Sequence, residues 1–395
     1  MDGAVPARCR RAGHRPYAAR PVDAPSLDLP PGSVAVVLGT RPEAVKLAGV
    51  VRLLGPAATV VHSGQHWAPE LAAGVLEEVG FPAPDAILDV GGGSRGAQLG
   101  QVVARLDARF ADRPPLAVVV QGDTTTTLGG ALAANAAGVP VVHVEAGLRS
   151  FDRRMPEEHN RVLTDHLADL CCAPTEVSRD HLVAEGIAAE RVEVTGNTVV
   201  EAVARLTPPR PERAAHLAAA GVEPDRFVLA TLHRPENVDD AAVLGAVLDE
   251  LAALPLPVVL PLHPRTAARA AGFGLDGALA RLRVCPPLTP RPFLALAAEA
   301  ALWVSDSGGL QEEASVLKRP VVVVRASTER PEVQGTFAVL VPPGPGIGEA
   351  ARAWLDDLPA VHARLAGLPT PYGDGSASAR TVAALGRLLG VAGCG

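Results

Sequence analysis

Short apolar runs alternate along the chain with segments in which hydrophobic residues recur every three or four positions. The run Val34–Leu38 is followed by a loop and then by apolar positions at helical spacing from Ala44 to Leu54. The pattern repeats between Leu116 and Val144, where two β-branched runs flank the helix-like stretch Thr124–Ala137, which Gly138 ends. Short buried runs separated by helices are typical of the parallel strands of an α/β protein.

A second series of the same kind occupies the other half of the chain. It begins near Gly196 and contains four strand-like runs at residues 227–231, 258–262, 302–305 and 321–325. Two alternating series predict an α/β fold of two doubly wound, Rossmann-like domains that face each other across a cleft.

These patterns also set the expected domain boundaries. Residues 1–33 hold several Arg and Pro but no continuous apolar segment, so we expect a disordered extension rather than a secretory signal. The first domain is placed at residues 34–195 and the second at 196–371. The segment 372–395 contains a predicted amphipathic helix, Ser376–Leu389, and is expected to pack back on the first domain.

The composition favours a globular protein that binds a small anionic ligand. The 395 residues are 48% hydrophobic, yet no apolar run reaches membrane-spanning length. A net charge of −7 without a long basic stripe argues against nucleic acid as a partner. The five cysteines form no C-x-x-C pair, and no His, Cys and Asp set has metal-ligand spacing. We therefore expect no bound metal and a reducing, cytoplasmic location.

Three carboxylates stand where a parallel sheet builds its ligand site. Asp123 and Glu145 follow two consecutive predicted strands, and the carboxyl ends of parallel strands open into one crevice. Glu157 follows Pro156, which suits the first turn of a helix. Because no metal-ligand set accompanies them, we interpret the three acids as candidate catalytic groups, with solvated carboxylates as the alternative. His143, inside the second strand, is interpreted as a core residue.

A candidate phosphate site lies in the second domain. Ser307, Gly308 and Gly309 follow a predicted strand and begin a helix, and the backbone N–H groups at such a helix N-terminus bind phosphate. The alternative is an ordinary strand-to-helix turn in which Gly only permits the dihedral angles. Glu313 lies four residues into this helix, on the side that faces sugar hydroxyls if a nucleotide binds there.

Basic side chains follow other predicted strand ends. Arg41 and Arg330 are placed to clamp a diphosphate from the two domains, and Lys46 extends from the first helix. For each of the three, a solvated or salt-bridged surface role is the alternative. His233 and His263 each end a predicted strand of the second domain and suit a diphosphate partner or a proton donor.

Nine motifs follow one another along the chain: GTRPEAVKLAGV, SGQH, QGDTTTT, HVEAGLRSFDRRMPEEHNR, TGNTVVEAV, TLHRPEN, SDSGGLQEEA, TERPE and PYGDG. In this order they resemble the non-hydrolysing UDP-N-acetylglucosamine 2-epimerases, and the resemblance covers nearly all of residues 34–389. It implies a glycosyltransferase-B-like fold, a homodimer, a UDP-sugar substrate and no cofactor. The implied reaction eliminates UDP to leave a 2-acetamidoglucal and then adds UDP back after the C2 proton returns on the other face.

The resemblance also implies roles for individual residues. Asp123, Glu145 and Glu157 resemble the carboxylates that handle the C2 proton, and His233 resembles the histidine near the leaving diphosphate. The positions that resemble UDP-binding residues are Arg41, Lys46, His263, Phe293, Ser307, Gly308, Gly309, Glu313 and Arg330. Within this set Glu313 is expected at the ribose and Phe293 beside the uracil, although a Phe on a helix face is more often a core residue.

The chain departs from the family pattern after Gln65-His66. Regulated bacterial members resemble Q-H-R-[EQ] at this place, where they contact a second, activating UDP-sugar, whereas this chain continues with Trp67 and Ala68. The departure argues against activation by substrate. Relatives that act on other sugars, including UDP-diacetamido uronic acids, also carry the HVEAGLRSFDRRMPEE form, so these sugars are alternative substrates. A glycosyltransferase of the same fold is a further alternative.

Overall fold

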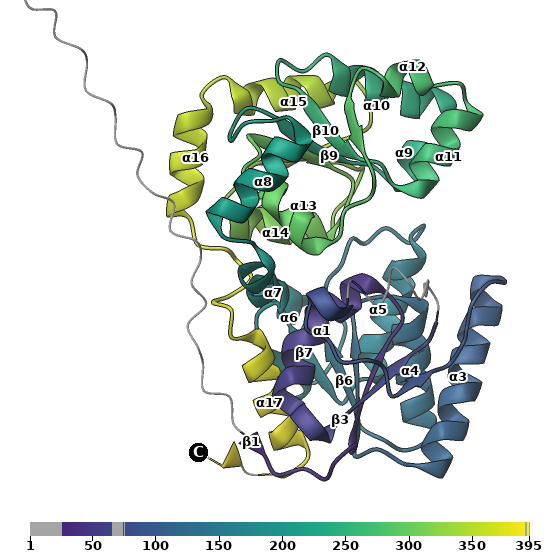
Figure 1. Cartoon of the computed structure of the whole chain (residues 1–395). Helices are drawn as coiled ribbons and strands as arrows, with labels where there is room; N and C mark the ends of the chain where they lie inside the picture. The colour runs from purple at the N-terminus through teal and green to yellow at the C-terminus, as the bar shows by residue number, and fades with distance from the viewer. Residues whose placement is uncertain (1–25, 65–73, 75, 392, 395) are drawn as a thin grey trace, which may run out of the picture.

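The computed structural model describes residues 26–64, 74, 76–391 and 393–394, and it contains two large parallel sheets (Figure 1). The first sheet has the order β4–β3–β2–β5–β6–β7–β8. Its strands are β2 (Val34–Leu38), β3 (Ala58–His62), β4 (Ala86–Ile87), β5 (Ala117–Gln121), β6 (Val141–Val144), β7 (Leu170–Ala173) and β8 (Val192–Val194). The second sheet has the order β11–β10–β9–β12–β13–β14. Its strands are β9 (Val228–Thr231), β10 (Val258–Pro261), β11 (Arg283–Cys285), β12 (Leu302–Ser305), β13 (Val321–Val324) and β14 (Ala338–Val341).

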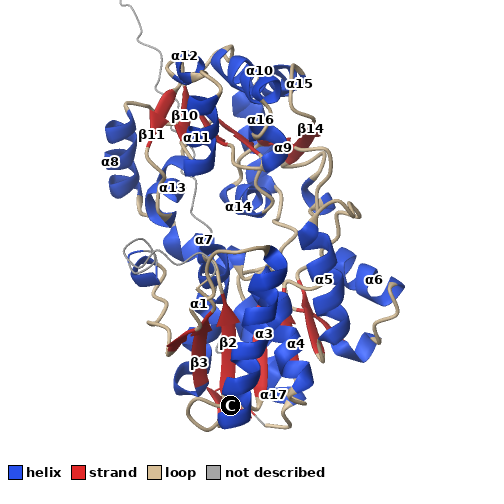
Figure 2. Ribbon diagram, turned by 90° about the vertical axis from the view of Figure 1, so that its right-hand side faces the viewer, coloured by secondary structure: helices blue, strands red, loops and turns tan. Residues whose placement is uncertain are grey.

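Helices cover both faces of the first sheet (Figure 2). The helices of this part are α1 (Arg41–Leu54), α3 (Arg95–Asp112), α4 (Thr125–Ala136), α5 (Pro156–Leu167) and α6 (Glu176–Ala184), with the 3-10 turns η1 (Gly55–Ala57) and η2 (Ala189–Arg191). One face packs against α1, and the other packs against α3, α4 and α6. Central strands buried on both faces are consequently almost entirely apolar.

The second sheet is also covered on both faces. Its helices are α8 (Arg210–Ala220), α9 (Pro235–Val238), α10 (Ala241–Ala252), α11 (Pro264–Gly272), α12 (Asp276–Leu279), α13 (Pro290–Ala297), α14 (Gly309–Leu317), α15 (Gly346–Leu355) and α16 (Leu358–Gly367), with the 3-10 turn η3 (Pro331–Val333). One face packs against α10 and α15, and the other against α13 and α14. In β13 all four residues are valine and all are buried, as expected for an inner strand of a parallel sheet.

The chain passes between the two sheets at α7 (Val199–Leu206) and returns to the first domain with α17 (Ala377–Leu388), which packs against α1 and β7. Figure 1 shows this last helix, in yellow, beside the first one, in purple. The predicted fold class, two Rossmann-like domains with a returning C-terminal helix, is therefore confirmed. The boundary predicted between residues 195 and 196 falls between β8 and α7.

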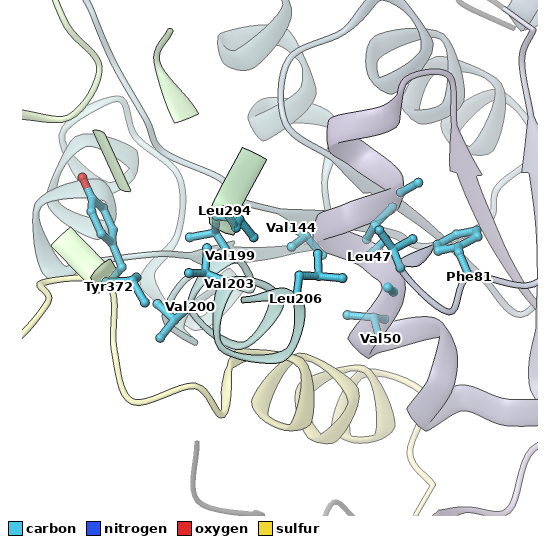
Figure 3. Close-up of a cluster of buried hydrophobic side chains, with 14 of the residues drawn as sticks. Leu47, Val50, Phe81, Val144, Val199, Val200, Val203, Leu206, Leu294 and Tyr372 are labelled. Carbon is cyan, nitrogen blue, oxygen red and sulfur yellow. The ribbon is translucent and has the colours of Figure 1, made fainter. Parts of the chain in front are cut away.

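One apolar cluster joins the two domains through α7. Val199 and Val203 of this helix lie beside Leu294 of α13, and Leu206 of the same helix lies toward Leu47 and Val50 of α1 (Figure 3). Buried apolar surface of this kind stabilises contact between domains without directional bonds. The position of one domain against the other is thus supported by a shared core.

Two local predictions need correction. The first helix begins at Arg41, one turn before the predicted Ala44, because Pro42 suits the first turn of a helix. Ser26–Leu27 form strand β1, which pairs with β15 (Gly393–Cys394), so the expected disorder is wrong at these two residues. Residues 28–33 of the expected extension are also described, and there the Gly32 N–H donates to the Pro56 carbonyl at 2.9 Å. Residues 1–25 lie outside the described part of the chain. None of the helices in the described part has the length and hydrophobicity needed to cross a bilayer.

Candidate functional site

Glu145, directly after β6, is the most heavily bonded of the predicted carboxylates. Its backbone has a positive φ of 70°, which is uncommon for a residue other than Gly. Lys46 donates to both carboxylate oxygens, at 2.6 and 2.7 Å, and Arg330 donates at 3.1 Å. The side-chain amides of Gln121 and Asn197 also donate to it. Glu145 thus lies buried between cations from the two domains rather than facing solvent.

A second buried acid, Glu312 of α14, shares the same two cations. Lys46 Nζ lies 2.9 Å from Glu312, and Arg330 donates to Glu312 at 2.9 Å. Burial raises the pKa of the Glu145 carboxyl, and the negative charge of Glu312 adds to this rise. For Glu312, burial acts in the same direction, but Arg330 and Lys46 outweigh it and hold the pKa below its ordinary value. Of the two acids, Glu145 is therefore the one that takes up a proton first.

Asp123 is held by the helix that also carries Glu157. Arg161 of α5 donates to the Asp123 carboxylate at 2.6 Å, and the side chain of Asn160 donates to the Asp123 carbonyl at 2.7 Å. Glu157 lies one turn earlier on α5, three and four residues before these two, so it shares their face of the helix. It is half-buried and forms no hydrogen bond or ion pair within the described residues. The structure thus brings Asp123 and the helix of Glu157 together.

The predicted histidines adjoin each other at the carboxyl ends of β9 and β10. The ring centroids of His233 and His263 are 5.6 Å apart, and His233 Nδ1 lies 3.0 Å from the buried carboxylate of Asp306. Burial, His233 and Arg41 together lower the pKa of His263 below its ordinary value. This environment therefore favours the neutral form of the His263 imidazole. Because Arg41 belongs to the first domain, its effect on His263 connects the two strand-end sites across the domain interface.

The predicted phosphate cradle adjoins Arg330. Ser307 and Gly308 precede α14, which begins at Gly309. A Cβ atom at Gly308 would lie 2.9 Å from a guanidinium nitrogen of Arg330, so a side chain there would displace this arginine. Arg330 therefore lies against the turn and contacts Glu145 at the same time. Its predicted role as a free diphosphate clamp remains a prediction, since in this structure its partners are carboxylates.

Glu313 and Phe293 occupy different environments within the second domain. The side chain of Glu313 is half-buried and forms no hydrogen bond within the described residues, and its pKa is raised to about 8 by burial and by the charge of Glu312. Its carboxyl group is thus available to a ligand. Phe293 packs edge-on against buried Trp303, with ring centroids 6.3 Å apart. This contact agrees with the alternative role of Phe293 as a core residue, and its uracil contact remains a prediction.

The buried carboxylate of Glu43 was missed by sequence reasoning and joins two loops of the site. It accepts hydrogen bonds from the Gly39 N–H at 3.0 Å and from three threonine hydroxyls, those of Thr40 at 2.7 Å, Thr124 at 3.0 Å and Thr127 at 3.1 Å. Thr124 also caps α4 through the N–H of Thr127, as predicted for one of the four threonines. Glu43 therefore fixes the loop that precedes α1 against the loop that carries Asp123.

Glu312, Glu329 and Arg161 were missed as well. Arg161 lies 3.0 Å from Glu329, which follows β13, so it joins Asp123 to the second domain. The position of Arg161, four residues after Glu157, was the available signal, because residues at this spacing share a helix face. For Glu312, the signal was a charged side chain whose helix neighbours three and four positions away, Gly308, Gly309, Ser315 and Val316, are small or apolar. Neither signal shows which residues Arg161 and Glu312 contact in the folded protein.

Two other expectations concern activation by substrate and metal binding. Trp67 and Ala68, on which the argument about activation depends, lie outside the described residues. In the part of the chain that the structure describes, no three His, Cys, Asp or Glu side chains form a group that could hold a metal ion.

Comparison with known proteins agrees with these motifs. The model of a family described as UDP-N-acetylglucosamine 2-epimerase matches residues 55–386. A UDP-N-acetylglucosamine 2-epimerase of Methanococcus maripaludis is 37% identical over 309 residues, which are 76% of this chain and 84% of the relative. A UDP-2,3-diacetamido-2,3-dideoxy-D-glucuronate 2-epimerase of Pseudomonas aeruginosa is 34% identical, over 90% of this chain and 99% of the relative.

Solved structures are also similar to this chain over most of its length. The Methanocaldococcus jannaschii UDP-GlcNAc 2-epimerase in complex with UDP-GlcNAc and UDP has a TM-score of 0.79 at 34% identity, covering 90% of this chain and 99% of its own. A second structure of the same protein has a TM-score of 0.69 at equal identity and coverage. The structure of this chain therefore superposes better on the complex than on this second structure.

Proposed function

This chain is an isomerase of the UDP-N-acetylglucosamine 2-epimerase family, and we propose that it inverts C2 of a UDP-2-acetamido sugar. The proposed reaction converts UDP-N-acetylglucosamine to UDP-N-acetylmannosamine. One observation carries the proposal: Arg330 contacts Glu145 at 3.1 Å and lies against the turn at Gly308. A candidate proton-handling acid and a candidate phosphate cradle therefore adjoin one another across the domain interface.

The proposed chemistry couples loss of the C2 proton to departure of UDP. A carboxylate takes the proton, the C2–H electron pair forms the C1=C2 bond of a 2-acetamidoglucal, and the C1–O bond breaks with its electrons on the diphosphate. In the return step a diphosphate oxygen attacks C1 and a proton is delivered to the opposite face of C2. An unactivated C2–H is a weak acid, so simultaneous stabilisation of the leaving group lowers the barrier.

We assign the proton transfers to the group formed by Asp123, Glu145 and Glu157. Glu145 has a pKa raised by burial, as a group that exchanges protons near neutrality requires. Asp123 and the α5 face that carries Glu157 adjoin one another, and Asp123 pairs with Arg161, whereas Glu145 pairs with Lys46 and Arg330. Glu329 links the two groups through its contacts with Arg161 and Arg330. Acids in separate environments are suited to separate acid and base roles.

UDP is assigned to the second domain. The N–H groups of Gly308 and Gly309 at the start of α14, together with the Ser307 hydroxyl, would receive the diphosphate, since the Ser307 N–H donates to the Ser305 hydroxyl at 3.0 Å. His233 and His263 would stand near the bridging oxygen, and Arg41 would approach from the first domain. Arg330 and Lys46 would supply positive charge behind the cradle. Glu313, which lies beyond the first turn of α14, would accept hydrogen bonds from the ribose hydroxyls.

A second substrate class is favoured by one comparison. The Pseudomonas relative is named for a UDP-diacetamido glucuronate and aligns over 90% of this chain. The deciding experiment incubates the purified protein in D2O with a panel of UDP-2-acetamido sugars and follows deuterium at C2 together with the epimeric product. UDP-N-acetylglucosamine is expected to give the manno epimer with deuterium at C2. Absence of exchange with every member of the panel would falsify the proposal.

Two further assays separate the neighbouring activities. Release of free UDP with free N-acetylmannosamine would indicate a hydrolysing enzyme, and a requirement for an acceptor with C2 still protonated would indicate a glycosyltransferase. We also propose that the enzyme is a cytoplasmic homodimer, which light scattering on the purified protein and cell fractionation test directly.

A further inference from the structure

Two cations and two carboxylates alternate at the interface between the domains. Lys46 and Glu145 come from the first domain, and Glu312 and Arg330 come from the second. Each cation contacts both acids: Lys46 lies 2.6 Å from Glu145 and 2.9 Å from Glu312, and Arg330 lies 3.1 Å and 2.9 Å from the same two. All four side chains are buried. With every group ionised, the cluster of four is electrically neutral.

The charge balance changes when Glu145 takes up a proton, as the proposed function requires. The cluster then carries one net positive charge, and Glu312 remains as the anionic partner of both cations. Without Glu312, the same step would leave Lys46 with neither of its two carboxylate partners and would leave Arg330 with Glu329, which lies 3.2 Å from it. A buried unpaired charge is costly, so in that case Lys46 would hold Glu145 in its ionised form.

We propose that Glu312 is a positioning residue of the epimerase, which holds Lys46 and Arg330 from the second domain so that Glu145 can exchange a proton. The proposal rests on the proposed function and deepens it. Glu312 touches neither sugar nor nucleotide in this assignment, because its carboxylate is occupied by the two cations. Since Glu312 belongs to α14, the proton-exchanging state of Glu145 forms only when the two domains are in contact.

The surroundings of Glu145 leave Glu312 as its principal acidic neighbour. The charged or titratable groups that face Glu145 or Glu312 are Lys46 of α1, Glu313 of α14, Arg330 of the loop after β13, and Tyr372 of the returning segment. Gln121 and Asn197 add neutral donors. The charge of Glu312 raises the pKa of Glu145, whereas Lys46 and Arg330 lower it. Loss of the Glu312 charge must therefore lower that pKa.

The test compares Glu312→Gln with wild type in the C2 exchange and epimerisation assays from pH 5 to 9. Gln retains the shape and one acceptor oxygen but not the charge. We expect kcat to fall about tenfold or more, with the Kd for UDP within about threefold, because Arg330 keeps its contacts with Glu145 and Glu329 beside the cradle. The limb of the kcat–pH profile that reports the ionisation of Glu145 should move to lower pH by about one unit or more. A residue with only a structural role would not move this limb.

Glu201→Gln is the matched control. Glu201 of α7 is half-buried, accepts a hydrogen bond from the Ser378 N–H at 3.1 Å, and like Glu145 has a pKa raised by burial, but it has no contact with the cluster. Its variant should keep the wild-type kcat and pH profile. If Glu312→Gln does not fold, Glu312→Asp keeps the charge farther from Lys46, and its limb should move part of the way in the same direction.

Failure of this inference and failure of the proposed function give different results. If wild type performs no C2 exchange, the proposed function is wrong. If wild type is active but the Glu312 variants keep the wild-type profile, whatever their kcat, Glu312 has no positioning role. A limb that moves to higher pH would overturn the inference in the same way.

Discussion

Lys46 of α1 and Glu312 of α14 form a buried ion pair of 2.9 Å that joins the two domains. The pair lies 266 residues apart in sequence and shares its cation with Glu145. Burying such a pair costs desolvation free energy, so its presence is weak support for stability by itself. The pair instead favours one docking arrangement of the two domains, the arrangement in which these charges are paired.

Lys46→Met should destabilise the protein strongly. The variant leaves Glu145 and Glu312 with Arg330 as their shared cation, and one uncompensated buried charge costs about 3 kcal/mol or more. Calorimetry and urea denaturation at pH 7 measure the change. Arg113→Met is the control, because Arg113 and its partner Asp112 have side chains that are 83% and 81% exposed, and it should stay within about 0.5 kcal/mol of wild type. Equal losses in the two variants would contradict the role given to Lys46.

Asp123→Asn should abolish C2 deuterium exchange while the Kd for UDP stays within about threefold. The amide keeps the volume of the side chain, and the nucleotide is assigned to the other domain, so binding should be little affected. Mass spectrometry of the product in D2O and titration calorimetry with UDP measure the two quantities. Asp239→Asn, in a partly exposed ion pair with Arg265, should retain exchange. Parallel loss of exchange and of UDP binding in Asp123→Asn would show that the assignment of Asp123 to chemistry is wrong.

The raised pKa of Glu313 predicts that the free energy of unfolding depends on pH. Its pKa is raised from 4.5 to about 8, so between these values the unfolded carboxyl ionises while the folded one keeps its proton. The folded state binds more protons in this window, and its stability therefore falls as pH rises from 4.5 towards 8. Glu313→Gln removes this slope and should gain about 1 kcal/mol or more relative to wild type between pH 5 and pH 8.5. Urea denaturation at both pH values tests it, and an unchanged difference would argue against a Glu313 carboxyl that stays neutral in the folded state.

Gly196 marks the place where the chain leaves the first domain. Its φ is 85°, and a Cβ atom there would lie 3.0 Å from the Tyr372 carbonyl of the returning segment. Gly186 has a similar φ of 89° with no atom within 4 Å of such a Cβ. Gly186→Ala should therefore cost about 1 kcal/mol from backbone strain alone, and Gly196→Ala should cost more because it also pushes the two crossing segments apart. Thermal unfolding of the two variants gives the comparison, and a smaller loss for Gly196→Ala would contradict it.

Much of the fold was predictable because the inner strands can be recognised from their own residues, without knowledge of the strands beside them. Runs such as Val321–Val324 are apolar at every position, since both faces of the sheet are covered by helices. Edge strands such as β4 (Ala86–Ile87) and β11 (Arg283–Cys285) were missed, because two or three partly exposed residues with one neighbouring strand leave no pattern. Their existence depends on the strand beside them.

For the candidate site, the positions of several residues were predictable from the sequence, but their bonding partners were not. Asp123, Glu145, His233 and His263 were identified because residues after parallel strands face one edge of a sheet, and this depends on local sequence. Their bonding partners were not predictable: Glu145 binds Lys46 99 residues away and Arg330 185 residues away. Which charges pair at that distance depends on how two separately folded sheets dock.

The sequence by itself determined the inner strands and the helices between them, where the acids and the glycine turn fall along them, and which family the motifs resemble. These properties follow from local periodicity and from the edge rule for parallel sheets. Only the tertiary structure decided that Glu312, and not its neighbour Glu313, shares Lys46 and Arg330 with Glu145. The physical reason is that a buried charge selects its partners by three-dimensional distance and desolvation, which no spacing along the chain encodes.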